Sequence, residues 1–173
     1  LSTSKLAPRI ARLSRVKKIA VSRVSLEGVI TPEELLIPGF HNFENAALAA
    51  RVAQHLKIPT ATIRKVLKKF TGLPHRLQLV RTIVRRPTTN NQPPMTISFY
   101  DDSAGTNPET AIAAIKSFKD PIIWIGGGKT KGFDYDPVAP VLKKMKVREA
   151  ILFGENKYQI EKAISGSAPI SIA

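Results

Sequence analysis

The spacing of apolar and polar residues predicts a helix, a strand and a helical hairpin in the first part of the chain. Residues 6–16 carry apolar side chains every three or four positions, which is typical of a helix. Apolar and polar residues then mix over 18–30 in a pattern that favours β-structure. Two short helices follow, with Asn42 and Thr60 as their expected N-caps, and residues 57–59 join them as an αα-hairpin.

The second part of the chain alternates strands with helices. Strands are predicted at 77–84, 95–100, 121–125, 150–153 and 170–172. Helices are predicted to begin at Asn107, Asp136 and Asn156. Because two of the strands are short and wholly apolar, we expect an α/β fold with a mostly parallel sheet covered on both faces. The pattern changes after Gly72-Leu73-Pro74, so we expect one domain over 1–74 and another over 75–173.

Composition indicates a folded protein without a membrane segment. Of the 173 residues, 43% are hydrophobic, which is enough for a packed core. No run of about 18 apolar residues occurs, and the opening stretch carries Lys and Arg instead of the apolar core of a signal peptide. Cysteine is absent, which excludes disulfides and thiolate chemistry and fits a reducing compartment. We therefore expect a cytoplasmic protein, and the start at Leu1 instead of Met fits a piece of a longer chain.

The chain is strongly basic, with 27 Lys and Arg against 13 Asp and Glu and a net charge of +14. Such an excess favours an anionic partner: nucleic acid, a membrane surface or a phosphorylated small molecule. Seven basic residues precede Glu27, the first acid, as they would in an arm that binds a polyanion. They also fit the solvated face of one helix, and the lack of aromatic residues for base stacking favours this second interpretation.

A glycine-rich stretch, Gly126-Gly127-Gly128-Lys129-Thr130, resembles the end of a phosphate-binding P-loop. The complete motif has another glycine where this chain has Ile123, and a helix follows it directly. Here residues 133–137 precede the next predicted helix, so a true P-loop is not expected. Two interpretations remain open: a turn that brings Lys129 or Lys131 to an anion, and a turn with a purely structural role.

Polar residues also gather between a predicted strand and a predicted helix, from Asp101-Asp102-Ser103 to Asn107. Free N–H groups at a helix start attract a carboxylate or phosphate, and an Asp there can bind a sugar hydroxyl or metal-bound water. Ordinary capping by Asn107 explains the same residues. At the domain boundary, Arg76 offers a planar, bidentate donor for phosphate, whereas a lone His75 is more often structural. No spacing of His, Cys and carboxylates indicates a metal site.

Four segments together resemble the Mur ligase family, and they occur in the family's order. Residues 36–46, LIPGFHNFENA, resemble the GxHNxxNaxAA signature that Mur ligases share with folylpolyglutamate synthases. Residues 70–76, FTGLPHR, resemble the FxGLPHR hinge of the members that add D-glutamate. Residues 102–108, DSAGTNP, and 127–134, GGKTKGFD, resemble the DSKATNP and GGxDKGxD segments of the same members. The resemblance spans residues 19–153, approximately, and four motifs in register are more specific than any one of them.

This resemblance implies the end of a central ATPase domain over 1–74 and a Rossmann-like domain that binds the amino acid over 75–173. It implies a ligase of peptidoglycan biosynthesis that adds D-glutamate to UDP-N-acetylmuramoyl-L-alanine. In that reaction ATP, with Mg²⁺, phosphorylates the substrate carboxylate, and the amine of D-glutamate attacks the acyl phosphate. The resemblance also implies a monomer, with no nucleic acid and no membrane among its partners.

The site residues follow from the same resemblance, position by position. Nucleotide-binding roles fall on Asn42, Asn45, Arg76 and Asp102, with Asn45 at the adenine and the last two near the ribose and phosphates of ATP. Thr106 and Lys131 would hold the carboxylates of D-glutamate, and His75 would mark the hinge. No catalytic residue and no metal ligand is implied in this chain, because the family's P-loop and metal-binding residues would lie upstream of Leu1.

The chain departs from the family pattern at two positions. Ala104 stands where the family has a lysine, so a cation that neutralises phosphate is missing, and Thr130 stands where the family has an aspartate. Because the upstream segments and the family's last segment lie beyond this sequence, we expect the chain alone to be inactive. Two alternatives remain: another Mur-type or folylpolyglutamate-type ligase, and a degenerate module that binds nucleotide or nucleic acid without catalysis.

Overall fold

The computed structural model describes residues 28–86 and 94–173. The predicted helix over 6–16 lies outside the described residues, as does most of the predicted strand over 18–30. Of that strand only 28–30 are described, and they form a turn and its exit, so the prediction is wrong for these three residues. Contacts divide the described residues into two compact units, the first made of 28–36 and 40–70 and the second of 37–39 and the described part of 71–173.

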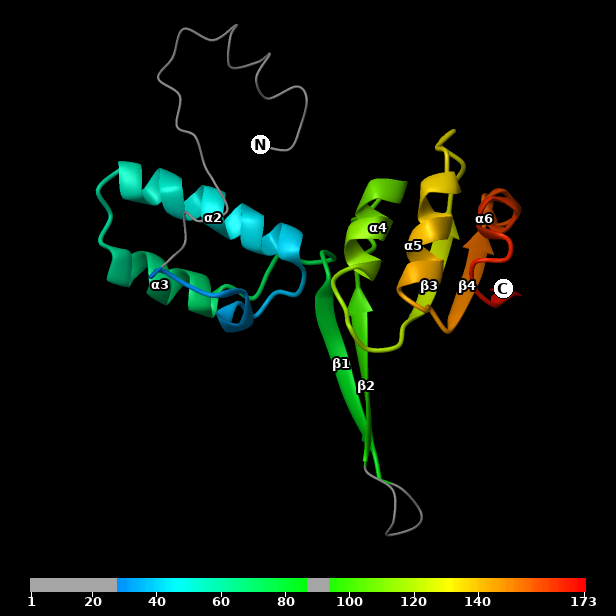
Figure 1. Ribbon diagram of the computed structural model, residues 1–173, viewed down its shortest axis with the longest axis horizontal. Helices are drawn as coiled ribbons and strands as arrows, with labels where there is room; N and C mark the ends of the chain where they lie inside the picture. The colour runs from blue at the N-terminus through cyan, green and yellow to red at the C-terminus, as the bar shows by residue number, and fades with distance from the viewer. Residues whose placement is uncertain (1–27, 87–93) are drawn as a thin grey trace, which may run out of the picture. The chain divides into compact units, whose positions relative to one another are not determined.

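The first unit is a helical hairpin, α2 (Phe40–His55) and α3 (Thr60–Lys69), preceded by a short 3₁₀ helix, η2 (Pro32–Glu34) (Figure 1). Its core contains three alanines of α2 and two larger side chains of α3: Ala46, Ala47, Ala50, Ile63 and Leu67. Lys57, with a φ of 60°, occupies the left-handed position that closes a helix, and the amide of Ile58 donates to the carbonyl of Ala53 at 3.0 Å. The predicted αα-hairpin is confirmed.

Both helices begin earlier than the sequence pattern predicts. Asn42 is the third residue of α2 and Thr60 is the first residue of α3, so neither is an N-cap. The backbone before each helix explains the difference. Gly39 has a φ of 97°, which makes the sharp turn into α2, and Pro59 has its φ held at −58° directly before α3.

The carboxylate of Glu34 ties η2 to α3. It accepts hydrogen bonds from Arg64 and, at 3.0 Å, from the Nζ of Lys68. The hydrogen bond from Lys68 is the largest of the causes that lower the pKa of Glu34, followed by the bond from the backbone of Thr31. Because these groups are accessible to water, the ion pairs contribute little to stability and mainly fix the position of the segment.

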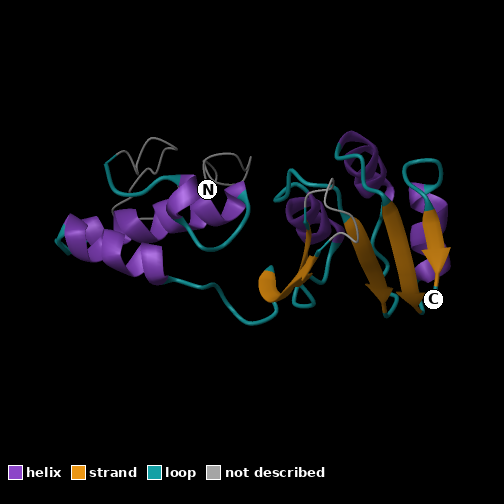
Figure 2. Cartoon of the chain, turned by 90° about the horizontal axis from the view of Figure 1, so that it is seen from below, coloured by secondary structure: helices purple, strands orange, loops and turns teal. Residues whose placement is uncertain are grey.

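The second unit contains two separate sheets (Figure 2). An antiparallel ribbon is made of β1 (Gln78–Arg85) and β2 (Met95–Asp101), and a parallel sheet has the order β3 (Ile123–Gly128), β4 (Glu149–Gly154), β5 (Ile170–Ile172). All five predicted strands are confirmed, although within the described residues β1 and β2 pair only with each other. A direct connection permits antiparallel pairing, whereas parallel neighbours need a crossover such as the helices that separate β3, β4 and β5.

The helices of the second unit pack around one core with the parallel sheet. They are α4 (Pro108–Ile115), the 3₁₀ helix η3 (Asp136–Val138), α5 (Ala139–Lys144) and α6 (Lys157–Ile164). Alternate residues of β4, Ala150 and Leu152, are fully buried with Leu142 and Ile164. Among the described residues no helix is both long and apolar enough to cross a membrane.

The opposite face of the parallel sheet is exposed. Ile123 and Ile125 of β3 are 57% and 64% exposed, and Phe153 of β4 is 44% exposed. The described helices therefore cover only one face of this sheet, and the prediction that both faces are covered is wrong for the described residues. The α/β class with a parallel sheet is confirmed, and the assignment of the first unit to an ATPase domain stays a prediction.

Candidate functional site

The turn around Arg76 is joined to the loop after β2 by two hydrogen bonds that backbone amides donate. The carbonyl of His75 accepts from the amide of Ala104 at 3.0 Å, and the amide of Leu77 donates to Asp102 Oδ1 at 3.0 Å. Two of the segments that sequence motifs single out are therefore in direct contact. The residue between the two bonded positions is Arg76, whose side chain is exposed.

The backbone on both sides of Arg76 is strained. His75 has a φ of 61° and Leu77 a φ of 44°, in the left-handed region that costs a non-glycine residue about 1–2 kcal/mol. The side chain of Leu77 is buried, and the amide of His75 donates to Gln78 Oε1 at 3.0 Å. The turn persists because these contacts and the bonds to the neighbouring loop hold it, and strain of this kind concentrates at functional sites.

A hydrogen bond between side chains adds a second link between the same two segments. His75 Nδ1 lies 2.7 Å from Asp101 Oδ2, and the amide of Ser103 donates to Asp101 Oδ1 at 2.8 Å. Since an ionised carboxylate only accepts, Nδ1 must carry the proton. The hydrogen bond from His75, followed by those from Ser103, lowers the pKa of Asp101 to about 2. Asp101 therefore remains charged well below neutral pH.

Replacing Asp101 with asparagine should lower the urea midpoint of the second unit at pH 5–7 and have a smaller effect near pH 2. A lowered folded-state pKa supplies stability above the unfolded-state value, and this stability is lost as pH falls from about 4 through about 2. Fluorescence of Trp124, the single tryptophan, reports unfolding of this unit. The control is Asp120→Asn, since the described residues show no hydrogen bond to Asp120. An Asp101 effect that stays equal at pH 2 and pH 7 would contradict this prediction.

Asp102 is enclosed by its own loop. Its carbonyl accepts from the amide of Gly105 at 2.7 Å, and a Cβ on Gly105 would lie 2.8 Å from Asp102 Oδ2. Thr106 follows with an exposed side chain, directly before Asn107. Asn107 Oδ1 accepts from the amide of Thr110 at 2.8 Å, so the predicted N-cap of α4 is confirmed. Capping thus explains Asn107, while Thr106 stays accessible.

Gly126, Gly127 and Gly128 form the end of β3, so the prediction of a turn at these glycines is wrong, and the stretch is, as expected, not a P-loop. Gly126, Gly127 and Gly128 pair with β4, and the next helix begins only at η3. The carbonyl of Gly128 accepts from the amides of Glu155 and Asn156 at 2.8 and 3.1 Å. These bonds fix the point where the chain leaves the sheet. Lys129 and Lys131 follow, and both side chains are exposed and therefore accessible to an anion.

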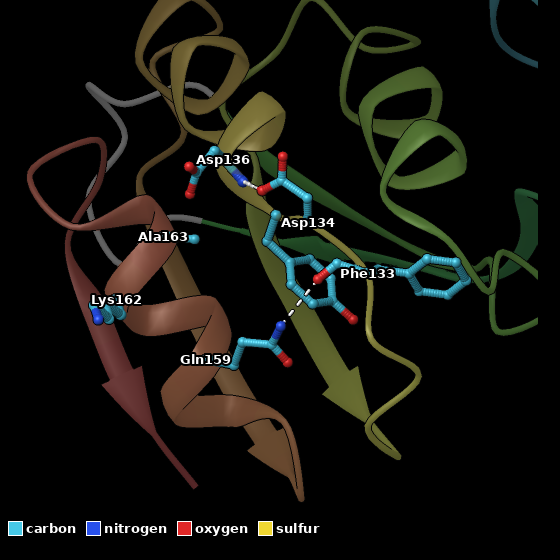
Figure 3. A pocket seen from close by; sticks show the side chains of 7 residues that line it. Phe133, Asp134, Asp136, Gln159, Lys162 and Ala163 are labelled. Carbon is cyan, nitrogen blue, oxygen red and sulfur yellow. Dashed lines mark hydrogen bonds between the residues drawn. The ribbon is translucent and has the colours of Figure 1, made fainter.

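A pocket of about 260 Å³ lies between the segment after Lys131 and α6 (Figure 3). Its lining residues come from this segment, from the first residue of η3 and from α6: Phe133, Asp134, Tyr135, Asp136, Gln159, Lys162 and Ala163. Gln159 Nε2 donates to the carbonyl of Phe133 at 2.9 Å, and the amide of Asp136 donates to Asp134 Oδ1 at 2.9 Å. None of the site residues expected from sequence lines this pocket. Sequence reasoning missed Gln159, which carries no signal beyond its place on an expected helix.

Asn42 and Asn45 lie in the first unit, three residues apart on α2. This spacing places them on the same side of the helix. Asn45 is exposed and Asn42 is half-buried. The structure thus brings together two groups of the expected site residues within their own units: the asparagines on α2, and the turn around Arg76 with the loop of Asp102.

The loops that carry Asp102 and Lys131 follow the ends of β2 and β3, and these two strands run in the same direction. Figure 1 shows the arrows of β2 and β4 pointing the same way, and β3 is parallel to β4. Ligands of α/β sheets bind beyond the carboxyl ends of the strands. Among the described residues no group of three His, Asp or Glu side chains is placed to hold a metal ion.

Comparison with known proteins identifies several similar sequences, although no family model matches the chain. It is 40% identical over 134 residues to the UDP-N-acetylmuramoylalanine–D-glutamate ligase of Caldanaerobacter subterraneus subsp. tengcongensis, which covers 78% of this chain and 27% of that protein. Proteins of the same name from Lactobacillus acidophilus and Natranaerobius thermophilus are 36% and 38% identical, each over 79% of this chain and 27% of the relative. The chain thus spans about a quarter of the length of these relatives.

A solved structure shares the fold of this chain. It is the structure of the UDP-N-acetylmuramate–alanine ligase of Thermotoga maritima, which matches with a TM-score of 0.56 and 19% sequence identity. The match covers 80% of this chain and 31% of that one, and at this identity it shows a shared fold alone. The sequence identity to the D-glutamate ligases and the shared fold agree, and the chain belongs to the Mur ligase family.

Proposed function

We propose that the full-length protein containing this chain is an ATP-dependent ligase that adds D-glutamate to UDP-N-acetylmuramoyl-L-alanine in peptidoglycan biosynthesis. The observation that carries the proposal is the 36–40% identity, over more than three quarters of the chain, to proteins named for that reaction. Such a reaction takes place in the cytoplasm, where ATP is available. The chain contributes side chains for nucleotide and for D-glutamate, and we expect no activity from it alone.

The turn around Arg76 suits a nucleotide phosphate or ribose. Its guanidinium is exposed, always charged and able to form two parallel hydrogen bonds with phosphate. Asp102 is held beside it through the amide of Leu77, with a geometry fixed by Gly105. A carboxylate accepts hydrogen bonds from ribose hydroxyls. The exposed amide of Asn45, with Asn42 one turn before it, supports a contact with adenine, whose edge both donates and accepts.

Thr106 and Lys131 suit the two carboxylates of D-glutamate. Thr106 supplies a hydroxyl directly before the N-cap of α4, and Lys131 supplies an ammonium on the segment after β3. Both side chains are exposed, and the strands before them point in the same direction (Figure 1). The strong positive charge of the chain favours the approach of nucleotide and acidic amino acid alike.

Two features set limits on the chemistry assigned to this chain. Ala104 carries no charge to neutralise a phosphate, so that task falls on Arg76 and on groups outside this chain. The described residues offer no set of three ligands for Mg²⁺. What this chain does is bind and orient, and orientation of two reactants supplies a large part of the rate in such a reaction.

Phosphate release by the full-length protein tests the proposal. With ATP, Mg²⁺ and UDP-N-acetylmuramoyl-L-alanine, we expect steady release only when D-glutamate is added, and little with L-glutamate or with other D-amino acids. The isolated chain, assayed in parallel, should release none. A ligase releases one phosphate for each amide bond, so product formed should equal phosphate released.

Other outcomes of this assay separate the alternatives. Release that requires another amino acid would point to a different ligase of the same family. The absence of release with every amino acid would overturn the proposal and favour a binding module without catalysis. In that case binding to nucleic acid that weakens steeply with salt would identify a polyanion as the partner.

A further inference from the structure

The segment that carries Lys131 has no regular secondary structure of its own. Residues 129–135, between β3 and η3, belong to no helix or strand. Within the described residues, no backbone hydrogen bond outside helices and strands is donated by an amide of 129–135. The position of the segment must therefore depend on contacts made by other parts of the chain.

The start of α6 supplies contacts at three successive points of this segment. At its beginning, the carbonyl of Gly128 accepts from the amides of Glu155 and Asn156. At its middle, Gln159 Nε2 donates to the carbonyl of Phe133 at 2.9 Å (Figure 3). At its end, Asn156 Nδ2 donates to the hydroxyl of Tyr135 at 2.8 Å.

These three contacts differ in how firmly they are held. Asn156 is 5% exposed, and Tyr135 packs against the core of the second unit, so the ends of the segment are tied to the protein interior. Gln159 is exposed, so the hydrogen bond that it donates to the carbonyl of Phe133 holds the middle of the segment from the surface. Lys131 lies between Gly128 and Phe133, so its backbone is held on both sides within these six residues.

We propose that the start of α6 acts as a clamp that positions Lys131, with Gln159 and Asn156 as positioning residues for carboxylate binding. This inference rests on the proposed function for its ligand, the carboxylate of D-glutamate. Lysine has a long, flexible stem, so its ammonium reaches one place reproducibly only when its backbone is fixed. When the hydrogen bond to Phe133 is lost, the loop between fixed points lengthens from Gly128–Phe133 to Gly128–Tyr135. More loop conformations then compete with the one in which Lys131 binds the carboxylate.

The substitution Gln159→Glu tests the clamp with little change of shape. A carboxylate cannot donate to the carbonyl of Phe133, and the side chain keeps its length. The matched control is Lys162→Gln, on the same helix and the same pocket, which changes the net charge by the same amount. A rescue variant, Gln159→Lys, restores a donor at this position.

Two measurements separate the fixed position of the segment from its effect on D-glutamate binding. Amide hydrogen exchange of 129–134 without ligand measures the freedom of the segment. In the full-length protein we expect faster exchange in Gln159→Glu, with the KM for D-glutamate raised about 2- to 3-fold and kcat unchanged. Lys162→Gln should change neither quantity, and Gln159→Lys should recover most of the loss.

Each result bears on the inference. Unchanged exchange in Gln159→Glu would overturn the clamp, whatever the activity. Faster exchange with an unchanged KM for D-glutamate, in a wild-type protein that depends on D-glutamate, would overturn the positioning of Lys131 while leaving the proposed function intact. A wild-type protein without any response to D-glutamate would overturn the proposed function and the ligand of the clamp, and the exchange rates would still report the clamp itself.

Discussion

Replacing Lys131 with alanine should raise the KM for D-glutamate about 10- to 100-fold in the full-length protein and leave the KM for ATP near its original value. A hydrogen bond between a charged lysine and a carboxylate contributes about 1.5–3 kcal/mol, and every 1.4 kcal/mol is about a factor of ten. The side chain is exposed, so its removal creates no cavity. The measurement is D-glutamate-dependent phosphate release over a range of D-glutamate and ATP concentrations.

Lys129→Ala is the matched control for this prediction. Lys129 lies two residues earlier on the same segment, is also exposed and carries the same charge. Loss of general electrostatic attraction would affect both variants equally, whereas loss of a specific carboxylate contact would affect Lys131 alone. Equal effects of the two substitutions on the KM for D-glutamate would contradict the role proposed for Lys131. A larger effect of Lys129→Ala would move that role to Lys129, the other residue that the sequence pattern allows.

Local periodicity predicted most of the helices and strands because it depends on which side of an element is buried. The strands at 150–153 and 170–172 are found as β4 and β5, within a residue at each end. The pairing of strands was not predictable in the same way, since it depends on residues far apart in the sequence. The pattern of 77–84 and 95–100 suits a strand in either sheet, and only the fold shows that β1 and β2 form their own ribbon. Helix starts were misplaced because the chain direction set by Gly39 and Pro59 outweighed side-chain capping.

The candidate site divides in the same way. Motifs singled out the segments of Arg76 and Asp102, but no spacing could show that the amide of Leu77 donates to Asp102. Gln159 and Asn156 gave no signal of a role at a binding site, because a polar residue at the start of a helix is ordinary in sequence. Their meaning comes from what lies opposite them in the fold. Sequence motifs thus located the groups that could touch ligands, whereas the groups that position them required the structure.

Replacing Gly127 with alanine should destabilise the second unit by about 3–5 kcal/mol, because strain and steric overlap combine at this residue. Its φ is 138°, which L side chains rarely adopt, and a Cβ would overlap the carbonyl oxygen of Phe153 on β4. That neighbour is backbone within a paired strand, so it cannot move aside as a side chain could.

Gly128→Ala is the control that separates strain from overlap. Gly128 has a similar φ of 143°, but a Cβ there would meet nothing within 4 Å. Backbone strain alone should cost about 1–3 kcal/mol. Urea unfolding followed by the fluorescence of Trp124, which lies in β3, measures both variants in the unit concerned. Equal midpoints for the two variants would show that the close approach of Phe153 to Gly127 does not limit stability. A clearly lower midpoint for Gly127→Ala would show that the end of β3 requires glycine because the backbone of β4 lies against it.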